Sequence, residues 1–185
     1  MTYIKGKVIR AIEFAAERHS GQSRKGNRIS PYINHPIKVV SLLLRFQEED
    51  SDLLSAAALH DIIEDTAKGE EKISELERII EKEFGSNVLS IVQEVSDDKQ
   101  LPFYERKQKQ IEDTPYLSND AKKIKIADKI CNITDIKKDP PVGWSKYRKN
   151  AYIEWAKKVV EGAEGVNKKL ETYFEEISRE VYNMI

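Results

Sequence analysis

Residues 53–66 read LLSAAALHDIIEDT, and this stretch decides the fold class. Its first half, residues 53–59, would be apolar on every side of a helix, so it belongs in the protein interior. Two pairs of titratable side chains follow at once: His60, Asp61, Glu64 and Asp65. Glu64 would lie one helical turn after His60, and Asp65 one helical turn after Asp61. The stretch predicts a single buried helix over residues 52–64 with a strongly charged end.

Nearly every other segment repeats its apolar residues at three- and four-residue steps, whereas alternation typical of strands is hard to find. The chain is therefore expected to be all-α, with a loop over residues 21–31 and a solvated turn over residues 70–72. Ser74 and Glu77 form a capping box that predicts a helix start, and Gly85 predicts its end. The expected helices cover residues 8–19, 36–43, 52–64, 74–84, 88–95, 102–112, 118–139, 145–160 and 166–182.

The composition limits the class of protein. A length of 185 residues without a linker or repeat predicts one domain over 1–185. The 31 basic and 32 acidic residues give a net charge of −1, which argues against a basic surface for nucleic acid. Apolar runs stay far below the ~20 residues that cross a bilayer, and no signal sequence opens the chain, so no membrane association is expected. Cys131 is the only cysteine, which favours a reducing compartment, the cytoplasm.

The charged end of the 52–64 helix indicates a cation. Three buried carboxylates without compensation would be unfavourable, and imidazole beside carboxylate is a ligand set for a divalent ion. Two further candidates lie elsewhere: His35 stands at a helix entrance before a proline, and Asp128 lies inside an otherwise apolar helix. The alternative is a salt-bridged helix end that holds no metal.

These residues lie in or near four longer sequence motifs: HSGQSRK (19–25), PYINHP (31–36), LHDIIEDT (59–66) and ADKICN (127–132). They resemble the hydrolase domain of the RelA/SpoT alarmone enzymes, within the HD superfamily of metal-dependent phosphohydrolases. EVSDDK (94–99), ERK (105–107) and GWS (143–145) resemble the stand-alone small alarmone hydrolases, including the metazoan SpoT homologues. The resemblance covers essentially the whole chain and implies an HD-domain bundle of about eight to ten helices.

The resemblance also implies roles for individual residues. One Mn²⁺ would be bound by His35, His60, Asp61 and Asp128. Glu64 and Asp65 would act in the hydrolysis. The nucleotide pocket would be lined by Arg24, Lys25, Lys99, Asn132, Arg148 and Tyr152. The reaction of the family removes the 3′-pyrophosphate of guanosine tetra- or pentaphosphate, so the implied partner is this small molecule and the oligomeric state is open.

The chemistry is coherent on physical grounds. A bound divalent ion polarises a phosphate and lowers the pKa of water, and a carboxylate one turn from the ligands can take the proton. Arg24, Lys25 and Lys99 are available as counter-charges for several phosphates. Against these roles, Lys99 and Arg148 could be solvated surface residues and Tyr152 could be packing. The competing functions are a phosphatase for a related nucleotide such as NADPH and a nucleotide sensor without turnover.

Overall fold

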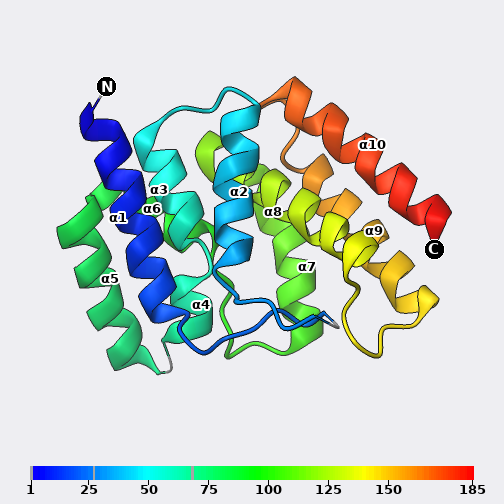
Figure 1. The fold of residues 1–185 in the computed structure, drawn as a ribbon, viewed down its shortest axis with the longest axis horizontal. Helices are drawn as coiled ribbons and strands as arrows, with labels where there is room; N and C mark the ends of the chain where they lie inside the picture. Colours follow the sequence, from blue (N-terminus) through cyan, green and yellow to red (C-terminus); the bar gives the residue numbers. More distant parts are fainter. Residues whose placement is uncertain (1, 27, 68) are drawn as a thin grey trace.

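A computed structural model describes residues 2–26, 28–67 and 69–185, and its regular structure is helical (Figure 1). Within these ranges the only extended pairing is an isolated bridge between Ser23 and Pro31. The prediction of an all-α chain is confirmed. The elements are α1 (Thr2–Arg18), α2 (Asn34–Arg45), α3 (Ser51–Leu59), α4 (Ile62–Thr66), α5 (Glu70–Phe84), α6 (Ser86–Val95), α7 (Phe103–Asp113), the 3₁₀ turn η1 (Thr114–Tyr116), α8 (Asn119–Lys138), α9 (Lys146–Glu161) and α10 (Lys168–Met184). Among the helices described, none is both long and apolar enough to span a membrane.

The helix α3 is buried on all sides. Its residues 53–59 are buried, and α1, α2 and α6 pack around it. The carboxylate of Asp50 caps the helix by accepting the backbone N–H of Asp52 at 2.8 Å and of Leu53 at 2.9 Å. The apolar run thus anchors one end of the candidate site in the core.

The helix α8 is the second buried element, and it crosses the middle of the molecule (Figure 1). It packs against α2, α6, α9 and α10, so apolar residues are needed on several of its sides. Ser118 caps it by accepting the N–H of Ala121 at 3.2 Å. This helix brings Asp128 and Asn132 towards the ends of α2 and α3.

The expected helix over residues 52–64 is wrong in one respect, because it is broken. α3 ends at Leu59 and α4 begins at Ile62, with Asp61 at φ −98° and ψ −3° between them. Consecutive side chains of a regular helix point about 100° apart. The break allows His60 and Asp61 to turn their polar atoms towards one point.

The start of α5 also differs from the prediction. The helix begins at Glu70, four residues before the expected capping box at Ser74, so residues 70–72 are solvated as predicted but form its first helical turn. Gly69 precedes it at a φ of 89°, a conformation that favours glycine. Glu70 and Glu71 then lie in the first turn, where negative charge interacts favourably with the helix dipole. The stop at Gly85 is confirmed, with a φ of 94°.

The turn between α9 and α10 is held by one buried carboxylate. Glu171 is only 5% exposed and accepts the backbone N–H groups of Gly165 at 2.8 Å, Val166 at 3.1 Å and Asn167 at 3.1 Å. We expect Glu171→Ala to lower the free energy of unfolding by about 2–4 kcal/mol, because these donors lose their partner. Urea unfolding measures the change. Glu175→Ala, an exposed glutamate of the same helix, should change it by less than about 0.5 kcal/mol, and equal effects would contradict the assignment.

Candidate active site

Four side chains from three parts of the chain converge at one point in the interior. His35 comes from α2, His60 and Asp61 from the break between α3 and α4, and Asp128 from α8. Asp128 Oδ1 lies 3.0 Å from His35 Nε2 and 4.0 Å from His60 Nε2. Asp61 Oδ2 lies 3.2 Å from His60 Nε2 and 3.8 Å from His35 Nε2. The structure therefore brings together all four residues predicted as metal ligands.

His60 shows most clearly what this cluster requires. Its Nδ1 lies 2.8 Å from the carbonyl oxygen of Ala57, which can only accept, so Nδ1 carries the hydrogen. Its Nε2 is buried, faces two carboxylates and accepts or donates no hydrogen bond within the described residues. Burial opposes a charge on this ring, but Asp61 outweighs burial and raises the pKa of His60 to about 9. Positive charge is therefore required at Nε2, and either a proton or a metal cation supplies it.

The other ligands fit a cation equally well. His35 is 1% exposed, and burial lowers its pKa, which keeps the imidazole neutral as a ligand must be. The pKa values of Asp61 and Asp128 are lowered despite their burial by the neighbouring His60 and Lys129, respectively, so both are carboxylates. Ligand atoms of His35, His60 and Asp128 lie within 4.8 Å of one another. Two ligand atoms that each lie about 2.1 Å from an ion are at most about 4.2 Å apart. Small side-chain shifts would therefore bring these ligand atoms to the separation that an ion requires.

The carboxylates of Glu64 and Asp65 lie on α4, directly after the break. Lys99 forms an ion pair with Asp65 and lies 3.6 Å from Glu64. Burial, together with the charges of Asp97 and Asp61, raises the pKa of Glu64 to about 7. A carboxylate with this pKa can exchange a proton near neutral pH. Lys99 therefore lies beside the acidic pair, and its predicted contact with the phosphates of a substrate stays a prediction.

Arg24 approaches the cluster from the loop before α2. Its Nη2 donates to Asn132 Oδ1 at 2.7 Å and to Asp135 Oδ2 at 3.1 Å. Asn132 Nδ2 in turn donates to Asp128 Oδ1 at 2.6 Å. Arg24 and Asn132 thus form one network with a candidate metal ligand, and their predicted contacts with a nucleotide stay predictions.

The three remaining residues predicted for the nucleotide pocket, Tyr152, Arg148 and Lys25, differ in their contacts and exposure. Tyr152 lies within hydrogen-bonding reach of Asn132, and its ring centroid is 5.7 Å from Trp144 and 5.3 Å from Trp155. Arg148 is exposed and stacks over Trp144 at 4.7 Å. The side chain of Lys25 is exposed, so a substrate contact by Lys25 stays a prediction.

The loop that carries Arg24 and Lys25 is fastened to the segment after α8. The carbonyl of Lys25 accepts the N–H of Val142 at 2.9 Å. A Cβ built on Gly26 would lie 2.9 Å from the backbone oxygen of Asp139, so only glycine fits this approach. The two loops therefore hold each other in place beside the site.

Several residues of the site escaped the sequence prediction. Tyr32 donates its hydroxyl to Asp61 Oδ2 at 2.7 Å, Lys129 donates to Asp128 Oδ2 at 2.7 Å, and Arg106 lies 3.7 Å from Glu64. All three lie in the family-like motifs quoted above, and Tyr32 and Lys129 also lie close in sequence to the predicted ligands His35 and Asp128, which was the available signal. His19, a buried histidine outside the ligand set, stacks on Tyr32 with their ring centroids 4.7 Å apart.

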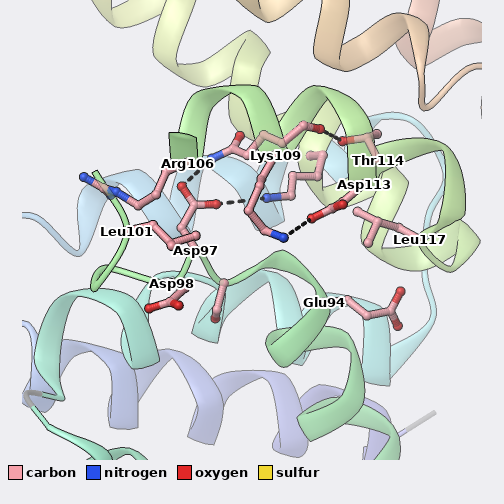
Figure 2. Close-up of a pocket in the computed structure, with 12 residues that line it drawn as sticks. Glu94, Asp97, Asp98, Leu101, Arg106, Lys109, Asp113, Thr114 and Leu117 are labelled. Atoms are coloured by element: carbon pink, nitrogen blue, oxygen red, sulfur yellow. Dashed lines mark hydrogen bonds and ion pairs between the residues drawn. The ribbon is translucent and has the colours of Figure 1, made fainter. Parts of the chain in front are cut away.

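A small hollow of about 60 Å³ lies between the end of α6, the segment 96–101 and α7 (Figure 2). Asp97 and Arg106 line it. The charge of Asp97 contributes to the raised pKa of Glu64, and Arg106 lies 3.7 Å from the Glu64 carboxylate. Its volume is far below the ~300 Å³ of a small-molecule pocket. The hollow adjoins the acidic pair but is too small for a nucleotide.

Comparisons with known proteins agree with this geometry. Residues 11–156 match the family model described as an HD domain. The guanosine-3′,5′-bis(diphosphate) 3′-pyrophosphohydrolase MESH1 of Xenopus tropicalis is 44% identical over 165 residues, which cover 89% of this chain and 88% of that protein. The protein of the same name from Homo sapiens is 42% identical, with 89% of each chain covered. A solved structure described as a metazoan ortholog of SpoT that hydrolyses ppGpp has a TM-score of 0.86 at 40% identity, covering 94% of both chains.

We expect Asp128→Ala to weaken binding of a divalent ion at least about 100-fold, because it removes one negative ligand from the cluster. Calorimetric titration with Mn²⁺ measures the affinity. Asp120→Ala, at the start of the same helix, is the matched control and should bind as the wild type does. Unchanged affinity in Asp128→Ala would show that the ion binds elsewhere.

Proposed function

This chain belongs to the HD-domain family of MESH1-type guanosine-3′,5′-bis(diphosphate) 3′-pyrophosphohydrolases, and we propose that it hydrolyses guanosine tetra- or pentaphosphate with Mn²⁺ as its metal. The products are GDP or GTP and pyrophosphate. The observation that carries this proposal is the buried set His35, His60, Asp61 and Asp128, with the acidic pair Glu64 and Asp65 one turn beyond His60 and Asp61. A nucleotide-binding module without catalysis would have no need of that acidic pair.

The ligand set would hold the ion through two imidazole nitrogens and two carboxylates, which balance a double positive charge. A bound divalent ion acts as a Lewis acid towards a phosphate and favours ionisation of water. Neutral His35 and the lone pair of His60 Nε2 face the centre for this purpose. Tyr32 donates to Asp61 Oδ2 and Lys129 donates to Asp128 Oδ2, so each carboxylate is held in place by a hydrogen bond.

Glu64 is the proposed proton acceptor, with Asp65 beside it. Water attacks the phosphorus bound to the 3′ oxygen, the bond from that phosphorus to the 3′ oxygen breaks, and the 3′ oxygen takes up a proton as the hydroxyl group. Pyrophosphate is released. Glu64 receives the proton of the water, and its raised pKa makes it a stronger base than an ordinary carboxylate.

The substrate-binding side is proposed to be cationic and aromatic. Arg24 and Lys99 already lie beside the cluster, and Lys25 is exposed in the same loop as Arg24. Guanidinium and ammonium groups are the ordinary partners of phosphate oxygens. Asn132, Arg148 and Tyr152 are proposed to contact the nucleoside. One domain over the whole chain and a cytoplasmic location stay predictions.

The proposal is tested by the identity of the released group. Purified protein with Mn²⁺ is incubated with guanosine 3′,5′-bis(diphosphate), and with NADPH as the competing substrate. We expect pyrophosphate and GDP from the first, detected by anion-exchange chromatography and ³¹P NMR. Orthophosphate from NADPH with an inert guanosine substrate would support the competing phosphatase. Tight nucleotide binding without any product would support a sensor.

A second prediction concerns Glu64. Glu64→Gln should retain the metal but lower kcat about 10²–10⁴-fold, because the amide cannot accept the proton. The pKa of Glu64 lies near 7, so the wild-type rate should fall as pH drops through this value and protonates the base. The residual rate of the variant should lack that acidic limb. A loss below about tenfold would remove Glu64 from the role of base.

A further inference from the structure

Lys107 on α7 is a cation held by aromatic rings. Its Nζ lies 3.4 Å from the ring centroid of Trp155, 5.6 Å from that of Tyr152 and 5.7 Å from that of Phe103. The indole N–H of Trp155 donates to the carbonyl of Lys107 at 3.0 Å, so the backbone and the side chain of Lys107 both contact this tryptophan. The side chain is half-buried, and its ammonium has no ion pair with any carboxylate in the described part of the chain.

A second ammonium group lies over the same indole ring. Lys129 Nζ is 4.8 Å from the Trp155 centroid and donates to Asp128 Oδ2 at 2.7 Å. Lys129 is only 4% exposed, so its charge is committed to that carboxylate. Lys107 and Lys129 thus contact the same indole ring, and Lys129 in turn binds Asp128, a candidate ligand of the metal.

The arrangement leaves one of the two positive charges uncompensated. Burial and the charge of Lys129 lower the pKa of Lys107 to about 7, and the carboxylates of Asp97, Asp128 and Glu64 oppose this only at longer range. Ring faces attract an ammonium group through their quadrupole, but they are poor hydrogen-bond acceptors compared with oxygen. They therefore fix the position of Nζ while its N–H donors stay available for a stronger acceptor.

We propose that Lys107 is a substrate-binding residue whose ammonium, positioned by Trp155, Tyr152 and Phe103, donates to the 3′-diphosphate that lies at the metal. This inference rests on the proposed function, which supplies the identity of the diphosphate. Phosphate oxygens are strong acceptors with full negative charge, and they would relieve the repulsion between Lys107 and Lys129. The leaving pyrophosphate keeps the same oxygens, so it should bind to the same ammonium.

The test uses inorganic pyrophosphate as the probe, because its binding requires no turnover. Calorimetry measures its Kd for protein loaded with Mn²⁺ and freed of excess ion. Lys107→Met keeps an unbranched side chain of similar length against Trp155, whereas Lys107→Arg keeps the charge. Lys109→Met is the matched control, since Lys109 lies on the same helix and pairs with Asp113 at 3.5 Å.

We expect Lys107→Met to raise the Kd of pyrophosphate about tenfold or more, with Mn²⁺ content unchanged. Lys107→Arg should stay within about threefold of the wild type, and Lys109→Met within about twofold. The KM for guanosine 3′,5′-bis(diphosphate) should rise most in Lys107→Met and little in Lys107→Arg and Lys109→Met. If Lys107→Met fails to fold, Lys107→Gln takes its place and carries the same expectation.

Three results would overturn the inference. They are pyrophosphate binding by a folded Lys107→Met within about twofold of the wild type, equal losses in Lys107→Met and Lys107→Arg, and no pyrophosphate binding by the wild type. The second result would assign Lys107 to packing against Trp155. Failure of the proposed function is seen separately, as absence of pyrophosphate release from the guanosine substrate while pyrophosphate added directly still binds in a Lys107-dependent way.

Discussion

The structure depends on the meeting of two imidazole nitrogens and two carboxylates inside a helical core. Such a set of acceptors is stable only with positive charge among them, and the surroundings are arranged to keep it in place. The break between α3 and α4 turns His60 and Asp61 to the same point, and Tyr32 holds one oxygen of Asp61. Lys129 and Asn132 hold Asp128 from two sides. Much of the local geometry thus follows from one electrostatic requirement.

Around this centre, charge is sorted although the chain as a whole is nearly neutral, with a net charge of −1. Carboxylates gather at the centre and on α4, while Arg24, Lys99 and Arg106 form ion pairs at its edge. A polyphosphate would exchange these internal pairs for its own contacts. Binding is therefore expected to rearrange side chains at the edge and to leave the buried helices in place.

The sequence predicted the helical class because that class follows from a strong local signal: an apolar run on all sides of a helix belongs in the interior. The local pattern marked His35, His60, Asp61 and Asp128 as candidates, but their meeting at one metal was implied by the resemblance to the alarmone hydrolases. The break after Leu59 could not be predicted, because the local pattern continues through it and only the contact with His35 and Asp128 favours it. The predicted helix start at Ser74 was wrong although its local signal, a capping box, is present. That motif lies inside α5, because the acidic first turn at Glu70 and Glu71 extends the helix back to Gly69. Tyr32 was missed because its partner Asp61 is brought to it by tertiary packing, whereas Lys129 is the sequence neighbour of its partner Asp128.

The fastening between Lys25 and Val142 has a consequence for variation among related chains. Because the main chains of the two loops are joined by a hydrogen bond and Gly26 lies against Asp139, neither loop can change its length alone without breaking this junction. The spacing of these two loops beside the site is thus set by the backbone. Evolution of ligand preference in this lineage should proceed by exchanging side chains on these two loops, and insertions should occur in both loops together or fall outside the junction.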